Sequence, residues 1–372
     1  MKGIECIELR KFITEYKQKN EKNEFKPVAV GKFGIRTRES IDSKELAKDY
    51  SKNKIIFKNT LTVGMGSRQI DIGILTDDVI YSVSPAYHTY KISGINADYL
   101  RYCLMCRNED MFKRFVKRGS RQGKSIDLKR WLEYEIPVYD VCNQEKIVLK
   151  LNKVTNVISM RKQQLQKLDE LIQARFVELF GNESNPKAWE IVNVESVADV
   201  QVGVVIKPSQ YYTDAIDGIK AFRSLNVGEG FIKDENWVYF TKEGHKKNAK
   251  SVLKENDLLI VRSGAPGTAC VVTKEYEGCN AIDIIIAHPN CEKVNPYYLC
   301  AYTNMPHGKK QINEGTGGAA QQHFNVTKYN KLQLMLPPMK LQDEFVTFVN
   351  QVNKSKLVIK NLLQIYKHQI QM

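Results

Sequence analysis

Basic side chains, glycine and glutamine gather in two short segments of the sequence, a combination that suits contact with a nucleic acid. Gly119–Ser125 reads Gly-Ser-Arg-Gln-Gly-Lys-Ser and lies in a stretch, 107–130, with nine Lys/Arg against three acids. The second segment runs from Gly315 to His323 and ends in Gln-Gln-His. Lysine and arginine neutralise phosphates, and arginine and glutamine also form paired hydrogen bonds with guanine and adenine edges. We predict two flexible loops, carried on a strand scaffold, that contact DNA.

Other basic and amide side chains are candidates for the same role, although each alone also fits an ordinary solvated surface. The candidate DNA-contacting residues are Arg36, Arg38, Arg68, Gln69, Arg118, Arg121, Gln122 and Lys124 in the first half and Lys207, Arg223, Arg262, Gln321, Gln322 and His323 in the second. The chain has 56 Lys+Arg against 42 Asp+Glu, a formal net charge of +14. Such an excess favours a polyanionic partner, most often a nucleic acid.

The familiar motifs of a catalytic or metal centre are missing from the sequence. There is no GxxxxGK[ST] loop, no GxGxxG after a strand, and no HExxH among the six histidines. Asn295-Pro296-Tyr297-Tyr298 is similar to the Asn/Asp-Pro-Pro-Tyr/Phe turn of DNA amino-methyltransferases, but it lacks the second proline, and the Phe-x-Gly-x-Gly cofactor loop is also missing. We interpret Asn295-Pro296 as a helix start. We predict no catalytic residue, no metal ligand and no cofactor in this chain.

The elements that must position the two segments occur twice along the chain. Ile95-Asn96-Ala97-Asp98-Tyr99-Leu100 is echoed by Val294-Asn295-Pro296-Tyr297-Tyr298-Leu299. Ile136-Pro137, followed by Gln144-Glu145-Lys146-Ile147-Val148, is echoed by Leu336-Pro337, followed by Gln342-Asp343-Glu344-Phe345-Val346. The order is kept, and the offsets stay between 196 and 200 residues. A duplicated unit indicates a target with two similar halves.

Two long helices follow the two globular units, because apolar residues recur there at spacings of 3 and 4 without glycine or proline. The predicted seam positions are Ile147, Leu151, Val154, Ile158, Leu165, Leu168 and Ile172 in the first helix and Phe345, Phe348, Val352, Ile359, Leu362 and Tyr366 in the second. Arg161 or Lys162 falls at a gap in the first seam, Ser355 takes a position in the second, and Gly181 is the expected cap of the first helix. We expect an antiparallel coiled coil, with packing of each helix on its own unit as the alternative.

The fold class is therefore α+β, with four segments. Two similar mixed α/β units at 1–142 and 183–338 alternate with long helices at 143–182 and 339–372. Strand-like runs include Ile55–Phe57, Val79–Val83 and Leu258–Val261. A helical stretch is expected over about 97–116, and a helix is expected at about 297–311. At about 1.5 Å per residue the long helices span roughly 45–55 Å, or one to one and a half turns of DNA.

The eight cysteines and the apolar segments suggest a compartment. The cysteines are scattered, with no signal segment at the start, which favours free thiols in a reducing cytoplasm. Cys103 and Cys106 have CxxC spacing but lie in an apolar helical run, so we interpret both as packing residues. No apolar stretch reaches the ~20 residues that span a bilayer.

Taken together, this layout resembles the specificity subunit of type I restriction-modification systems. The matching features are Ile136-Pro137 with Gln144–Val148, Leu336-Pro337-Pro338 with Leu341-Gln342, the Gly-rich segments at 119 and 315, and Trp189-Glu190 at the start of the second unit. The first unit opens with Ile4–Leu9 and lacks that tryptophan, so the duplication is poorest there.

The resemblance implies a non-catalytic protein with two target-recognition domains. Each domain would bind one half of a bipartite site in double-stranded DNA, and the helices would set the gap. Such subunits recruit two methyltransferase subunits, which use S-adenosylmethionine, and restriction subunits, which need ATP and Mg. The remaining alternatives are an atypical DNA methyltransferase or nuclease and a coiled-coil scaffold that binds proteins.

Overall fold

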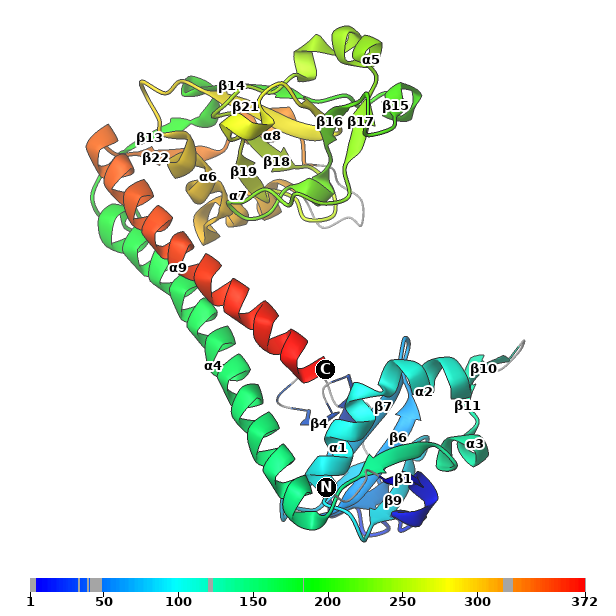
Figure 1. Ribbon diagram of the computed structural model, residues 1–372. Coiled ribbons are helices and arrows are strands. Elements are labelled where there is room, and N and C mark those ends of the chain that lie inside the picture. The colour runs from blue at the N-terminus through cyan, green and yellow to red at the C-terminus, as the bar shows by residue number, and fades with distance from the viewer. Residues whose placement is uncertain are drawn as a thin grey trace. The chain divides into compact units, whose positions relative to one another are not determined.

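The computed structural model describes residues 5–32, 34–38, 40, 49–119, 123–182, 184–316 and 324–371 (Figure 1). The chain forms two compact units, one of Met1–Lys162 with Asn361–Met372 and one of Gln163–Lys360. Both units mix strands and helices, so the α+β prediction is confirmed.

The first unit is built on a four-stranded antiparallel sheet. Its order is β2 (Ile13–Glu15), β9 (His88–Ile92), β6 (Thr60–Met65) and β7 (Ile70–Leu75). Leu61, Val63 and Ile70 point from this sheet into a core closed by Leu100 and Trp131. The smaller pairs are β1 (Glu5–Glu8) with β12 (Glu135–Val138), β3 (Val28–Gly31) with β4 (Gly34–Thr37), and β5 (Lys54–Ile56) with β8 (Tyr81–Val83).

The helical stretch predicted over 97–116 is present, but the chain divides it into two helices. The helices are α1 (Ala97–Cys106) and α2 (Asn108–Phe115), separated by Arg107 at φ −100° and ψ 7°. The Asn108 side chain explains the break, since its amide accepts from Ile70 N–H at 3.1 Å and donates to Ile70 C=O at 2.8 Å. Cys103 is buried as predicted, but Cys106 is exposed at the end of α1. All eight cysteines are free thiols.

The second unit repeats this topology. Its main sheet has the order β14 (Ala198–Val202), β21 (Ile284–Pro289), β18 (Leu258–Val261) and β19 (Ala269–Val271). β13 (Glu190–Asn193) pairs with β22 (Gln333–Leu336) as β1 pairs with β12, so the strand is repeated even where the tryptophan is not. The helices are α6 (Pro296–Asn304), α7 (Pro306–Thr316) and α8 (Val326–Asn330). The helix predicted at 297–311 is divided between α6 and α7.

A second sheet distinguishes this unit from the first. Its order is β15 (Tyr212–Thr213), β17 (Val238–Phe240), β16 (Ile219–Phe222) and β20 (Asn280–Ala281), and α5 (Lys242–Lys247) follows β17. The reading of Asn295-Pro296 as a helix start is confirmed, because Asn295 Oδ1 accepts from Tyr297 N–H at 2.9 Å. In each unit a short 3-10 helix follows the first strand: η1 (Leu9–Lys11) follows β1, and η3 (Val194–Ser196) follows β13.

A buried glutamine joins each long helix to its unit. Gln144 is 2% exposed and Gln342 is fully buried. Gln342 Oε1 accepts from Asn295 N–H at 2.8 Å, and its Nε2 donates to Pro337 C=O at 2.8 Å. Gln144 makes the same two bonds, to Asn96 N–H at 2.9 Å and to Tyr139 C=O at 2.7 Å. The repeated Gln in the sequence is therefore a repeated structural joint.

Replacing Gln342 with leucine should lower the free energy of unfolding of the second unit by about 2–3 kcal/mol. The substitution leaves a backbone donor and a backbone acceptor unpaired in a dry site. Chemical denaturation followed by tryptophan fluorescence would measure it. Gln351→Leu, at an exposed position of the same helix, is the matched control and should change stability by less than about 0.5 kcal/mol. Equal effects of the two changes would contradict the joint.

The first long helix, α4 (Val141–Phe180), begins in the first unit and ends in the second. Ile147 packs on the first core, and Ile172 packs on the second. All seven seam positions predicted in this helix are buried or half-buried, and Arg161 at the gap is half-buried while Lys162 is exposed. Gly181 ends the helix in the left-handed conformation (φ +88°), donating its N–H to Val177 C=O at 2.8 Å, as predicted for a cap.

The second long helix is α9 (Met339–Gln371), and within the second unit it runs antiparallel to α4. Arg175 on α4 pairs with Glu344 near the start of α9, whereas Asp169, one and a half turns earlier, pairs with Lys356 further along. The six predicted positions of α9 are buried or half-buried. Ser355 is exposed, so its placement in the seam is wrong; Lys356 turns inward instead because its ammonium reaches Asp169.

Candidate nucleic-acid interface

The turn between β6 and β7 presents Arg68 and Gln69 at one end of the first sheet. Gly66 N–H donates to Gln69 C=O at 3.1 Å and closes the turn. Arg68 is exposed and Gln69 is half-buried. The Asn108 side chain, at the start of α2, bonds both the N–H and the C=O of Ile70, so the turn is fixed to that helix. A fixed turn holds side chains at defined positions for a ligand.

The described residues of the basic segment at 119–125 belong to the two strands of a hairpin rather than to a loop. β10 (Val116–Gly119) and β11 (Gly123–Ile126) are antiparallel, with Arg118 opposite Lys124. Arg121 and Gln122 lie outside the described residues. Lys124 Nζ donates to Ser67 C=O at 2.6 Å, so this hairpin contacts the β6–β7 turn. The structure thus brings together Lys124, Arg68 and Gln69, which the sequence placed in separate segments.

A carboxylate that the sequence analysis missed lies beside this turn. Burial raises the pKa of the Asp71 carboxyl, and the neighbouring Gln69 side chain partly offsets this effect. Tyr87 is close to both Asp71 and Arg38, and burial raises the pKa of its phenol, with the negative charge of Asp71 adding to the effect. Tyr87 Oη donates to Val30 C=O at 3.0 Å. Arg36 and Arg38 lie on and just after β4, both half-buried, so Arg38 belongs to the same neighbourhood.

In the second unit the corresponding turn joins β18 and β19, and Arg262 leads into it. Its guanidinium donates to Asp283 and, at 3.3 Å, to Phe324 C=O, while its own C=O accepts from Phe324 N–H at 3.2 Å. Gln321, Gln322 and His323 lie outside the described residues. Arg262 makes structural contacts beside the β18–β19 turn, and its role in DNA binding stays a prediction.

The two other candidates of the second unit differ from one another. Arg223 is half-buried, and its Nη2 donates to Asn236 C=O at 2.5 Å, so its guanidinium braces the neighbouring turn. Lys207 is exposed, in a left-handed conformation (φ 41°) before Pro208. It follows Val204, which bridges to Ile282 at the same end of the sheet as Arg262. Among the second-unit candidates that the structure describes, Lys207 is exposed, whereas Arg223 and Arg262 are half-buried.

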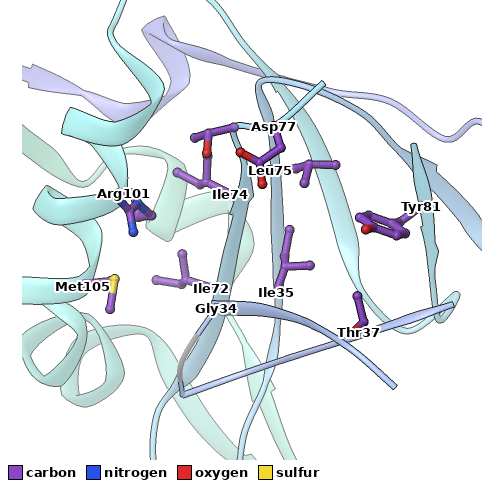
Figure 2. A pocket seen from close by; sticks show the side chains of 11 residues that line it. Gly34, Ile35, Thr37, Ile72, Ile74, Leu75, Asp77, Tyr81, Arg101 and Met105 are labelled. Carbon is purple, nitrogen blue, oxygen red and sulfur yellow. The ribbon is translucent and has the colours of Figure 1, made fainter. Parts of the chain in front are cut away.

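The outer edge of the first sheet carries a separate pocket of about 260 Å³. Figure 2 shows Ile72 and Ile74 of β7 on one wall, with Arg101 and Met105 of α1 beside them and Ile35 and Tyr81 on the other side. Arg101 is paired with Asp98 at 2.6 Å and lies over the Tyr102 ring. The lining of this pocket mixes aliphatic and polar groups and does not include Arg68 or Gln69 of the β6–β7 turn.

No group of three or more His, Cys, Asp or Glu among the described residues is arranged to hold a metal ion. None of the helices in the described part of the chain is long and apolar enough to cross a membrane.

A duplicated α+β unit in which each copy carries a long helix defines the class of protein. The chain belongs to the family described as the type I restriction modification DNA specificity domain, whose model matches residues 6–170 and 186–365. The resemblance seen in the sequence is thereby confirmed.

Individual relatives are distant. The specificity subunit of type I restriction enzyme MjaVIII from Methanocaldococcus jannaschii is 24% identical over 148 residues, 36% of this chain and 34% of that protein. The specificity subunit of type I restriction enzyme EcoBI from Escherichia coli is 20% identical over 167 residues, 45% of this chain and 35% of that protein. The matches thus span about a third of the length of these curated relatives.

Two solved structures share the fold over the whole chain. One, from a study of complex assembly and conformational transition of the type I R-M system, has a TM-score of 0.59 at 16% identity and covers 100% of this chain and 96% of its own. The S subunit from M. genitalium has a TM-score of 0.57 at 12% identity and covers 100% of this chain and 95% of its own.

Proposed function

We propose that this chain is the DNA sequence-specificity subunit of a type I restriction-modification complex, binding a bipartite site with one half-site per unit. The observation that carries the proposal is that both units have the same strand order but different side chains at a corresponding β-hairpin turn, where Lys124 contacts the first turn and Phe324 contacts Arg262 at the second. Two units with the same strand order but different side chains at the turn would bind two different half-sites.

The proposal includes partner subunits that supply the chemistry. Two methyltransferase subunits would use S-adenosylmethionine to methylate adenine, and restriction subunits would use ATP and Mg, so this chain itself would not be an enzyme. The complex would act in the cytoplasm, where its free thiols would stay reduced.

Exposed aliphatic side chains on the long helices support the recruitment of partners. Leu149 and Met160 on the first-unit part of α4 are 59% and 66% exposed, and Leu171 on the second-unit part is 47% exposed. These positions are eleven residues apart in sequence, about three helical turns, so each recurs on the same helix face. An apolar stripe opposite a buried seam suits a docked helix of another subunit.

Expression with the neighbouring methyltransferase and restriction genes, followed by sequencing of host DNA for modified adenines, tests the proposal. We expect methylation at a split motif with a constant gap. An assembled complex that gives no motif would favour the scaffold alternative. S-adenosylmethionine binding by the purified chain alone would favour the enzyme alternative.

Replacing Arg68 with alanine should weaken DNA binding several-fold for all sequences and lower the slope of log K against log salt by about one. Removing one phosphate contact has this effect because one fewer counterion is released on binding. Fluorescence anisotropy with the assembled complex at several salt concentrations measures the slope. Lys274→Ala is the control. Lys274 pairs with Glu277 and follows β19, at the end of that strand away from the β18–β19 turn. An unchanged slope for Arg68→Ala would remove Arg68 from the interface.

A further inference from the structure

The segment that follows β14 presents an exposed aliphatic side chain at one end of the main sheet of the second unit. Ile206 is 78% exposed, and its neighbour Val205 is 49% exposed. We propose that Ile206 is a specificity-determining residue of the second unit, and that its side chain contacts the methyl group of a thymine in the half-site of that unit. This inference rests on the proposed function, and it names one chemical group of the DNA and the residue that contacts it.

The strand register places this segment beside the β18–β19 turn. The last residue of β14 pairs with Ile285 of β21, and the last residue of β18 pairs with Ile284. The chain therefore leaves β14 and β18 at the same end of the sheet. Residues 203–207, which follow β14, and residues 262–268, which form the β18–β19 turn, both lie at that end. Ile206 thus belongs to the same end of the second unit as the turn that corresponds to the β6–β7 turn of the first.

Asp283 connects the segment to the β18–β19 turn. Its N–H donates to Val204 C=O at 3.1 Å, and its carboxylate accepts from the Arg262 guanidinium. Val204 N–H donates to Ala281 C=O at 2.8 Å. Both backbone groups of Val204 are therefore bonded two residues before Ile206. A side chain that projects from a fixed support can contact a base at a defined position.

The backbone conformation of the segment is specialised on both sides of Ile206. A Cβ at Gly203 would lie 2.3 Å from the carbonyl oxygen of Ala281, so a glycine is needed for this close approach. Lys207 has φ 41°, a left-handed conformation that is uncommon for lysine. Residues in such conformations concentrate at ligand-binding sites, where surrounding contacts maintain them. The conformation of this segment therefore favours a binding role over that of a passive surface loop.

The chemistry of the exposed tip selects the kind of base contact. Isoleucine offers DNA an apolar contact and no hydrogen bond. In the major groove the thymine methyl group accepts such a contact, and the other three bases lack it. Lys207, exposed next to Ile206, supplies a charge that can neutralise a phosphate. An exposed isoleucine alone is ordinary on a protein surface. The fixed backbone before Ile206 and the lysine after it are what indicate a base contact.

The first unit carries a different side chain at the corresponding place. β2 takes the position of β14 in the sheet order, and the segment that follows β2 begins with Tyr16. Tyr16 Oη donates to Ile55 C=O at 2.8 Å, and its ring lies 5.3 Å from that of Phe57 between centroids. This aromatic side chain packs within its own unit. We therefore expect the effect of Ile206 in one half-site and not in the other.

The experiment uses the complex assembled with its methyltransferase subunits and a synthetic duplex that carries the motif found by sequencing of modified adenines. Each thymine of both half-sites is replaced in turn by uracil, which removes the methyl group and keeps the base pair. We expect one of these replacements to weaken binding about 3- to 10-fold, the effect of losing one buried apolar group. Ile206→Ala should weaken binding to the thymine duplex by a similar factor and should make the complex insensitive to that uracil.

Two further variants show whether the effect belongs to Ile206. Ile216→Ala is the matched control, because Ile216 is 93% exposed and lies in the turn between β15 and β16 of the second sheet. This variant should keep the affinity of the unmodified complex and its sensitivity to uracil. Ile206→Val keeps a branched aliphatic side chain, so it should keep the preference for thymine over uracil.

Separate outcomes overturn the two proposals. If the unmodified complex selects no split motif, the proposed function fails. If it selects a motif but no uracil changes the affinity, only the assignment of Ile206 fails. The assignment also fails if Ile206→Ala stays as sensitive to uracil as the unmodified complex, or if Ile216→Ala has the same effect as Ile206→Ala. If Ile206→Ala abolishes all binding, the thymine preference of Ile206→Val decides, and its loss overturns the assignment.

Discussion

Replacing Phe176 with alanine should destabilise the second unit by about 3–5 kcal/mol, since a buried aromatic ring is lost and a cavity remains. Phe176 is 1% exposed and lies near the end of α4. Its ring contacts Phe180 at 5.0 Å and Phe345 of α9 at 5.5 Å between centroids, and it stacks on Tyr298 of α6 at 6.2 Å. One side chain therefore joins both long helices to the second core.

Thermal and chemical unfolding of the whole chain measures this effect. The units can unfold separately, so the transition of the second unit should shift while that of the first stays in place. Leu171→Ala, on the same helix and 47% exposed, is the matched control and should change stability by less than about 0.5 kcal/mol. A uniform shift of both transitions, or an equal effect of Leu171→Ala, would contradict the role of Phe176 as the joint between helices and core.

Much of the fold was predictable because it depends on patterns that the sequence repeats. The offsets of 196 to 200 residues predicted two equivalent units, and the matching strand orders confirm them. Spacings of 3 and 4 predicted both long helices, since a narrow apolar stripe needs a helical partner. Residues of α4 contact both the globular cores and the other long helix. Ile147 packs on the core of the first unit and Ile172 on that of the second. Arg175 and Lys356 form ion pairs between the two helices.

The candidate site was less predictable, because its geometry depends on contacts between distant segments. The sequence gives Arg262 no visible partner, yet in the structure its guanidinium donates to the Asp283 carboxylate and to Phe324 C=O. Asp71 carries a negative charge in a basic region and gave no signal, although its carboxyl is half-buried beside the β6–β7 turn. The remaining candidates, among them Arg36, Arg38 and Lys207, stay predictions.

Lengthening both long helices by one heptad should lengthen the gap of the recognised motif by about three base pairs and leave both half-sites unchanged. Seven helical residues add about 10 Å, and base pairs are about 3.4 Å apart. The insertions belong after Lys162 in α4 and after Lys360 in α9, where the two compact units divide. Both ion pairs between the helices, Arg175–Glu344 and Asp169–Lys356, then remain on one side of the insertions.

The rotation of the added segment predicts a second, quantitative result. A heptad turns an α-helix by about 20° less than two full turns, whereas three base pairs rotate DNA by about 100°. The lengthened complex must therefore twist its site, and we expect slower methylation at the new gap than at the original one. Sequencing of modified adenines in cells that express the variant gives both the gap and the extent of modification. A heptad in α4 alone would shift Asn361–Met372 of α9 relative to the rest of the first unit and should abolish methylation; an unchanged gap after the paired insertion would exclude the helices as the spacer.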